Sequence, residues 1–221
     1  MLANNETGVI QPIEEIVRLS QPFDTFVHTD AIQACGKVNL DWGILGVDAL
    51  SLSAHKIGGP QGVGALILNK KFDLDARFFG GGQERSFRPG TENVPGIVGF
   101  GLAAELAADL DRNKGIELLR NELERKILKI APNAVIHGQQ AQRIPNTSCI
   151  SMPGVLAETQ IMKFDLAGIM VSAGSACSSG KIHNSHVLKA MGVKESEASS
   201  AIRVSLGYKN TIDEIFETSK N

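Results

Sequence analysis

Several polar side chains that could serve one reaction follow closely on two short apolar segments of the chain. Asp30 and Gln33 follow the first segment, and Ser53, His55 and Lys56 follow the second. A lysine amine can bind an aldehyde covalently, and a carboxylate can keep a ring nitrogen protonated so that the ring accepts electrons. Gln33 could hydrogen-bond a ring oxygen, while Ser53 and His55 could donate to a phosphate. These residue types together indicate a site for pyridoxal 5′-phosphate.

Each of these residues taken alone has a simpler explanation. A single lysine is most often a solvated surface residue. An aspartate after a strand is most often a turn residue or a helix cap. The glycines of residues 58–64 could form ordinary turns, and they lack the G-K-[ST] ending of a nucleotide P-loop. Only the whole set of residues therefore indicates a cofactor site.

Cys177 is a second reactive group, in a segment rich in serine and glycine. This composition is typical of an exposed loop. The thiolate is the reactive form of cysteine, and Lys181, His183 and His186 could lower the thiol pKa. Without a cofactor site, an exposed cysteine with no role would be the simpler explanation. Together with Lys56, Cys177 is a candidate nucleophile.

Alternating strands and helices must bring the first set of side chains together. Apolar segments bounded by glycines and polar residues predict strands at 26–29, 49–53 and 64–68, and Pro12 can open a helix. This alternation is typical of an α/β layer with a mainly parallel sheet. The carboxyl ends of parallel strands lie at one edge, so Asp30 and Lys56 could meet there.

The pattern changes to α+β after about residue 132. A long helical tract, with apolar residues at helical spacing from 98 to 127, leads into this part. We expect residues 1–110 to form part of a large α/β domain, and residues 111–221 to form a smaller α+β domain. The expected strands lie near 147–152, 168–173 and 201–206, and the expected helices near 155–165, 184–191 and 211–219, the last starting with a capping box of Thr211 and Glu214.

The composition is that of a soluble globular protein, with 43% hydrophobic and 21% charged residues and a formal net charge of −2. This charge gives no electrostatic footprint for nucleic acid or an anionic membrane surface. No apolar stretch reaches the length of a membrane span. The three cysteines are far apart and have no zinc spacing, which favours a reducing compartment: the cytosol or an organelle matrix. Of these we expect a cytoplasmic protein. Cys35 and Cys149 lie in apolar contexts, so we expect both to be buried packing residues.

Five motifs follow one another along the chain: N-N-E-T-G at 4–8, H-T-D-A-I-Q at 28–33, S-x-S-A-H-K-I-G-G-P-Q-G-V-G at 51–64, G-G-G-Q-E-R-S-F-R-P-G-T-E-N at 80–93, and S-A-G-S-A-C-S-S-G at 172–180. With these motifs in this order, the chain resembles the fold-type-I cysteine desulfurases of the class V aminotransferase family, in the branch that serves iron–sulfur assembly. The resemblance implies the fold of a pyridoxal-phosphate-dependent transferase, with part of its α/β large domain and the smaller α+β C-terminal domain. It also implies conversion of L-cysteine to L-alanine, with transfer of the sulfur to an enzyme cysteine as a persulfide.

The resemblance gives roles to the residues of the cofactor site. Lys56 resembles the lysine that binds pyridoxal phosphate covalently and later moves the substrate's α-proton. Asp30 and Gln33 resemble the partners of the cofactor ring. Ser53 and His55 resemble ligands of its phosphate.

Four further residues resemble functional residues of the family. Asn5 resembles the asparagine near the cofactor, and Thr91 the threonine that reaches the phosphate of the neighbouring subunit, which implies a homodimer. Arg203 resembles the arginine that binds the substrate carboxylate, a task suited to the bidentate guanidinium. Cys177 resembles the cysteine that accepts the sulfur and passes it to an acceptor or iron–sulfur scaffold protein.

Other interpretations of the same residues stay open. A selenocysteine lyase or a transaminase of this fold would also keep Lys56, Asp30 and Arg203, but a transaminase does not need Cys177. By the resemblance, the chain starts inside the large domain and lacks N-terminal residues that hold the cofactor. It could therefore be a non-catalytic fragment that only associates with partners. We expect the isolated chain to self-associate, or to need the missing segment in trans, and to bind the cofactor weakly or not at all.

Overall fold

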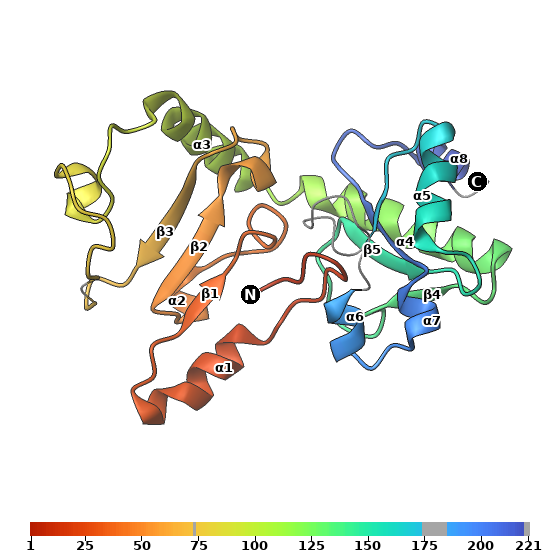
Figure 1. Ribbon diagram of the computed structural model, residues 1–221, viewed down its shortest axis with the longest axis horizontal. Coiled ribbons are helices and arrows are strands. Elements are labelled where there is room, and N and C mark those ends of the chain that lie inside the picture. Colours follow the sequence, from red (N-terminus) through yellow and green to blue (C-terminus); the bar gives the residue numbers. More distant parts are fainter. Residues whose placement is uncertain (73, 174–184, 219–221) are drawn as a thin grey trace. The chain divides into compact units, whose positions relative to one another are not determined.

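The fold is that of a computed structural model, which describes residues 1–72, 74–173 and 185–218. The chain divides into two compact units (Figure 1). Met1–Leu2 and Gln11–Asp109 form the first, and Ala3–Ile10 and Leu110–Asn221 form the second. Cys177 and most of its serine-rich segment lie outside the described residues.

The first unit contains a three-stranded sheet. Its strands are β1 (His28–Asp30), β2 (Ala49–Ser53) and β3 (Gly64–Leu68), in the order β1-β2-β3. β1 pairs with β2 in parallel, and β2 pairs with β3 antiparallel. The predicted α/β class is confirmed, and β2 and β3 have the predicted bounds. The described sheet is mixed, with one parallel and one antiparallel pair.

Helices and 3-10 turns connect these strands. A helix, α1 (Ile13–Ser20), forms where it was predicted, with Pro12 as its N-cap residue, one position before the expected one. The next helix, α2 (Trp42–Leu45), is capped by Asp41, whose Oδ1 accepts from the backbone N–H groups of Gly43 and Ile44. The remaining elements of this unit are α3 (Val94–Ala107) and the 3-10 turns η1 (Gln21–Phe23), η2 (Ala54–Ile57) and η3 (Gln83–Ser86).

The core of the first unit contains many small side chains. Near its strands the buried residues include Ala31, Ala34, Ala49 and Ala54. α3 buries only Gly96 and Ala103. The unit therefore leaves large apolar side chains exposed, including Val94, Ile97, Val98, Leu102 and Leu106 on α3 and Leu66 and Ile67 on β3.

The second unit contains four strands and five helices among the described residues: the strands are β4 (Val135–His137), β5 (Thr147–Ser151), β6 (Ser172–Ala173) and β7 (Ala201–Ser205), and the helices are α4 (Arg112–Ile130), α5 (Ala157–Leu166), α6 (His186–Ala190), α7 (Glu195–Ala198) and α8 (Ile212–Thr218). The strands form an antiparallel sheet in the order β4-β5-β7-β6.

The long helical tract predicted from the sequence consists of two helices, α3 and α4, which lie in different units. β4 and α7 were not predicted, because each is too short to show a periodic pattern.

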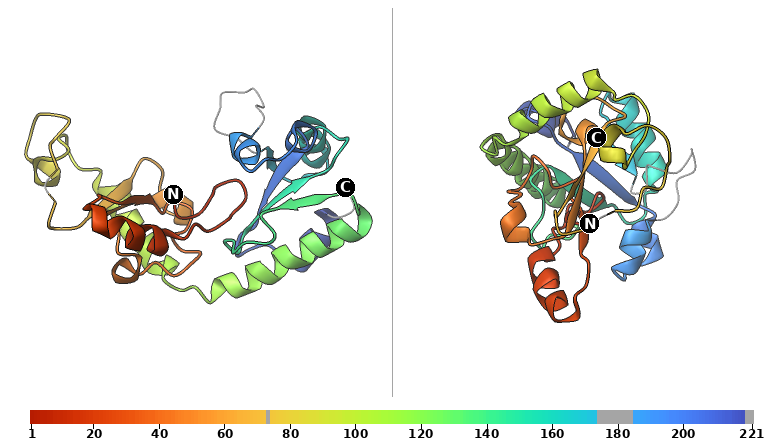
Figure 2. Two further views of the ribbon diagram at one scale, coloured as in Figure 1. Left: turned by 90° about the horizontal axis from the view of Figure 1, so that it is seen from below. Right: turned by 90° about the vertical axis from the view of Figure 1, so that its left-hand side faces the viewer.

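The two faces of this sheet differ in character. One face carries Ile136, Ile150 and Ile202, which form the main core with residues of α4, α5 and α8. Figure 2 shows the long green α4 along this side of the sheet. Because paired residues share a face, the strand register places His137, Cys149, Arg203 and Ser172 in one row on the other face. Leu188 of α6 and Ala198 of α7 pack there against Cys149 and Ala201.

The last helix begins as its sequence predicts. The backbone N–H of Thr211 donates to Oε2 of Glu214 at 2.8 Å, and the N–H of Glu214 lies 3.4 Å from the hydroxyl of Thr211. This reciprocal pair is the predicted capping box. No helix among the described residues is long and apolar enough to cross a membrane.

Candidate functional site

The parallel pairing of β1 and β2 brings their carboxyl ends to one edge of the first unit's sheet. Asp30, the last residue of β1, lies opposite Ser51, two residues before the end of β2. Asp30, Ser51 and Ser53 share one face, because side chains alternate along a strand. The structure therefore places Asp30 and Ser53 on the same face at the same edge.

The residues that follow β2 carry hydrogen-bonding groups and an amine. The hydroxyl of Ser53 and Nδ1 of His55 are 2.8 Å apart and form a hydrogen bond. His55 and Lys56 lie in η2, and both are exposed. The turn ends at Gly58, whose φ of 87° favours glycine. The chain thus reverses just after Lys56 and leaves its amine accessible.

A further polar pair lies on the same face. Nε2 of His28 and the hydroxyl of Ser51 are 2.7 Å apart. Neither residue was predicted as a site residue, although both lie inside the motifs noted above. The period-two pattern of the strands was the available signal, since it puts His28 on the face of Asp30 and Ser51 on the face of Ser53.

Asp30 and Gln33 flank the turn after β1. Oδ1 of Asp30 accepts from the backbone N–H of Ile32 at 2.8 Å. A carboxylate accepts several hydrogen bonds, so this contact leaves capacity for a ring nitrogen. The backbone carbonyl of Gln33 accepts from Nζ of Lys37 at 2.9 Å, and the side-chain Oε1 of Gln33 lies 3.4 Å from the same amine.

This donor set fits the chemistry of pyridoxal phosphate. Lys56 offers an accessible amine for an aldehyde, and Asp30 offers a carboxylate for a pyridinium nitrogen. The Ser53–His55 pair offers a hydroxyl and an imidazole for phosphate oxygens. These groups follow two adjacent parallel strands, which is where α/β sheets commonly bind ligands.

Thr91 lies exposed between η3 and α3. The loop before it is closed by its own contacts: Oε1 of Gln83 accepts from the backbone N–H of Gly90, and Nη1 of Arg88 donates to the carbonyl of Gly90. Asn93 then caps α3 through the N–H of Gly96. Thr91 is therefore displayed on the surface of the unit.

Asn5 and Arg203 belong to the second unit. Nη1 of Arg203 donates to the backbone carbonyl of Asn5 at 3.0 Å. Nε of Arg203 is buried and has no hydrogen-bond partner among the described residues. Asn5 therefore lies in the unit of Arg203, whereas Asp30, Ser53 and Lys56 lie in the other.

The two described cysteines differ in burial. Cys149 is fully buried, and burial together with the charge of Glu6 raises the pKa of its thiol to about 12. Cys35 is only half-buried, so its expected full burial is wrong: it lies in the turn after β1 rather than inside the sheet. Burial still raises the pKa of Cys35. Both thiols are poor nucleophiles near neutral pH.

Comparison with known proteins gives consistent matches along the chain. The model of the class V aminotransferases matches residues 1–217. A cysteine desulfurase from Cereibacter sphaeroides is 47% identical over 97% of this chain and 55% of its own length. The crystal structure of a NifS-like protein from Rickettsia africae matches with a TM-score of 0.91 and 41% identity, over 99% of this chain and 58% of the other.

The structure of SspA in complex with cysteine also matches, with a TM-score of 0.75 and 31% identity over 95% of this chain and 58% of the other. The chain therefore spans about half the length of the curated relatives it matches.

Proposed function

The chain belongs to the class V aminotransferase family, and on that premise we propose that it forms part of a pyridoxal-phosphate-dependent cysteine desulfurase. The observation that carries the proposal is the arrangement of four residues at the carboxyl ends of the adjacent parallel strands β1 and β2. Asp30 and Ser53 end these strands, and His55 and Lys56 follow β2. The names of matched relatives, which are cysteine desulfurases, support the same activity. The substrate would be L-cysteine and the product L-alanine.

The residues of the first unit would hold the cofactor and move protons. When bound, pyridoxal phosphate supplies an electron sink for the substrate's α-carbon. Asp30 would keep the ring nitrogen protonated, and Ser53 and His55 would bind the phosphate. Gln33 would orient the ring through its oxygen. Lys56 would hold the cofactor through its amine and, once the substrate displaces it, would move the proton of the α-carbon.

The residues of the second unit would bind the substrate. Arg203 would bind the substrate carboxylate, because a guanidinium offers paired donors to two carboxylate oxygens. Its Nη1 is held by the carbonyl of Asn5, which restricts the orientations of the guanidinium. Asn5 would contribute its side-chain amide near the cofactor.

Cys177 would accept the sulfur, a role proposed from its sequence context alone. Its thiolate would attack the sulfur of L-cysteine. The new S–S bond forms as the Cβ–S bond breaks, and the electron pair of the broken bond stays with the carbon skeleton. Cβ then takes up a proton, so alanine leaves and Cys177 carries the persulfide. A sulfur acceptor, such as an iron–sulfur scaffold protein, would then take the terminal sulfur.

Lys56 provides the direct test of the cofactor site. The protein that contains this chain is mixed with pyridoxal phosphate, reduced with borohydride, digested and analysed by mass spectrometry. We expect the labelled peptide to contain Lys56 and to disappear in Lys56→Ala. Lys70→Ala, which removes another exposed lysine of the same unit, should keep the label. A label that remains on a different lysine would contradict the assignment.

Cys177→Ser tests the sulfur-transfer step separately. This variant should keep the absorbance of the bound cofactor and lose alanine formation from L-cysteine. Cys35→Ser is the matched control and should retain turnover. Radioactive sulfur from cysteine recovered on Cys35 or Cys149 would assign the acceptor role to another residue.

We also propose that the active protein is a homodimer. Thr91 is exposed at the end of a loop that is closed by its own hydrogen bonds, so it is available to a second subunit. In the dimer it would reach the phosphate site of its partner. Thr91→Ala should then weaken cofactor binding without changing the reactivity of Lys56 toward the aldehyde.

A further inference from the structure

The segment from Ala3 to Ile10 is a tight turn held in the second unit. Oδ1 of Asn4 accepts from the backbone N–H groups of Glu6 and Thr7, each at 2.9 Å. The chain reverses at Gly8, with φ of 75°, and a Cβ at Gly8 would lie 3.2 Å from the side chains of Ile144 and Thr147. These hydrogen bonds and this close packing hold the local backbone around Asn4 and Gly8 in the turn.

One side of the turn is attached to residues 142–144. The backbone N–H of Ile144 donates to the carbonyl of Gly8 at 2.8 Å. The backbone N–H of Ile10 donates to the carbonyl of Gln142 at 2.9 Å, and Val9 forms an antiparallel bridge with Arg143. These contacts join the turn to the loop before β5.

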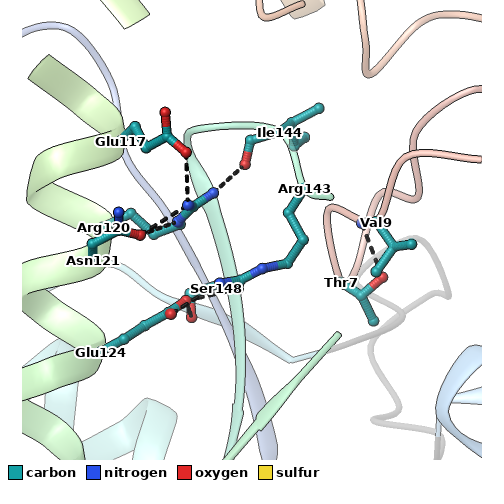
Figure 3. A network of polar contacts seen from close by, with 9 residues as sticks. All are labelled: Thr7, Val9, Glu117, Arg120, Asn121, Glu124, Arg143, Ile144 and Ser148. Carbon is teal, nitrogen blue, oxygen red and sulfur yellow. Dashed lines mark hydrogen bonds and ion pairs between the residues drawn. The ribbon is translucent and has the colours of Figure 1, made fainter. Parts of the chain in front are cut away.

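That loop is in turn fixed to α4 (Figure 3). The guanidinium of Arg143 makes two hydrogen bonds of 2.7 and 2.9 Å to the carboxylate of Glu124, and both side chains are almost fully buried. Ser148 donates to the same carboxylate, and Arg120 donates to the carbonyl of Ile144 at 2.8 Å. The turn therefore has a rigid support on this side.

Glu6 attaches the other side of the turn to α6. Its side chain is 1% exposed, and its carboxylate accepts a hydrogen bond from the hydroxyl of Ser185, which is 3% exposed. The same hydroxyl accepts from the N–H of Leu188 at 3.0 Å and so caps α6. Burial of a carboxylate is costly, and an apolar side chain would fill the same space at less cost. A specific use of the carboxylate would explain why it is buried here.

The neighbour of Glu6 in the turn contacts the proposed substrate-binding residue. The carbonyl of Asn5 accepts from Nη1 of Arg203, and among the described residues the buried Nε of this guanidinium has no hydrogen-bond partner. A shift of the turn that displaces this carbonyl would break its hydrogen bond to Nη1 of Arg203.

We propose that Glu6 is a positioning residue: its hydrogen bond with Ser185 fixes the turn, so that the carbonyl of Asn5 orients Arg203 toward the substrate carboxylate. The inference rests on the proposed function, because it takes Arg203 as the ligand of that carboxylate. It assigns Glu6 a role in substrate affinity and none in the chemical step.

Steady-state kinetics of the protein that contains this chain test the inference. Glu6→Ala should raise KM for L-cysteine about tenfold and change kcat by less than about threefold, because an interaction that binds ground state and transition state equally affects KM alone. Glu6→Gln should recover most of the affinity, since its amide oxygen still accepts from Ser185. Gln160→Ala is the control: it removes a buried side chain that bonds the carbonyls of Val155 and Ser200, and should leave KM unchanged.

The outcomes separate the inference from the proposed function. Wild-type protein that forms no alanine would overturn the proposed function. With wild-type turnover present, an unchanged KM in Glu6→Ala would overturn the role of Glu6, as would an equal rise in Gln160→Ala. If Glu6→Ala does not fold, Ser185→Ala removes the donor instead and should also raise KM.

A second measurement does not need turnover. Cys149 lies opposite Arg203 in the register and is fully buried, so the rate at which a thiol reagent labels it reports opening at Arg203. Peptide mass spectrometry of the native chain should show faster labelling of Cys149 in Glu6→Ala than in Gln160→Ala at equal thermal stability. Equal labelling rates in the two variants would mean that Glu6 does not position Arg203.

Discussion

Nη1 of Arg203 donates a hydrogen bond of 3.0 Å to the backbone carbonyl of Asn5, a residue 198 positions earlier in the chain. The bond fixes one end of the guanidinium while its Nε remains without a partner in the described part of the chain. A planar group held at one nitrogen can present its remaining donors in a defined direction, which is what bidentate binding of a carboxylate needs.

Arg203→Lys should therefore impair substrate binding although it keeps the positive charge. A lysine amine cannot bind both the carbonyl of Asn5 and two carboxylate oxygens in one plane. We expect KM for L-cysteine to rise about tenfold or more, measured by alanine formation. Arg125→Lys, which changes an exposed arginine paired with Glu122, is the control and should have no effect. Equal KM values in the two variants would exclude Arg203 as the ligand.

Cys149 should resist alkylation in the native protein. Because its pKa is raised to about 12, only about one molecule in ten thousand carries the thiolate at pH 8, and the side chain is also inaccessible. Iodoacetamide at pH 8 should leave Cys149 unmodified until urea unfolds the chain, as followed by peptide mass spectrometry. Rapid native labelling would show that β5 is not buried in solution.

The Arg143–Glu124 pair should contribute strongly to the stability of the second unit. Arg143→Ala removes the cation that is hydrogen-bonded to the buried Glu124 carboxylate, and breaking a buried pair in this way typically costs about 3–5 kcal/mol. Urea unfolding of the chain should show this loss. Arg125→Ala breaks the exposed pair with Glu122 and should leave the midpoint almost unchanged. If Arg143→Ala lost no more stability than Arg125→Ala, Glu124 would have gained water or another donor in place of Arg143.

The exposed apolar side of α3 should drive self-association of the isolated chain. Val98 and Leu102 are 66% and 58% exposed, one turn apart on a helix that buries little. β3 is an edge strand of the described sheet, and its residues Leu66 and Ile67 are also exposed. Sedimentation velocity should show species larger than a monomer, and Val98→Glu with Leu102→Glu should reduce them.

Leu118→Glu provides the matched control for this prediction. Leu118 is 69% exposed on α4, in the other unit, and its substitution adds one negative charge, as each of the two changes on α3 does. It should leave the association unchanged. A compact monomer in the wild-type chain would contradict the prediction, whatever the variants do.

The sequence by itself determined the local elements and the residue types of the site. Apolar runs bounded by glycine predicted β2 and β3 with their observed bounds, and Pro12 and the Thr211–Glu214 pair marked two helix starts. These features depend on neighbours within a few residues, which is why the pattern sufficed. Elements of three or four residues, such as β4 and α7, are too short to show a period and were missed.

Only the tertiary structure decided which distant residues meet. It placed Asn5 with Arg203, joined Glu6 to Ser185, and set Asp30 opposite Ser51. It also left Cys35 half-buried, although its apolar neighbours suggested a core position. Such contacts depend on strand register and on the packing of a whole unit, and neither is fixed by the residues adjacent in the chain.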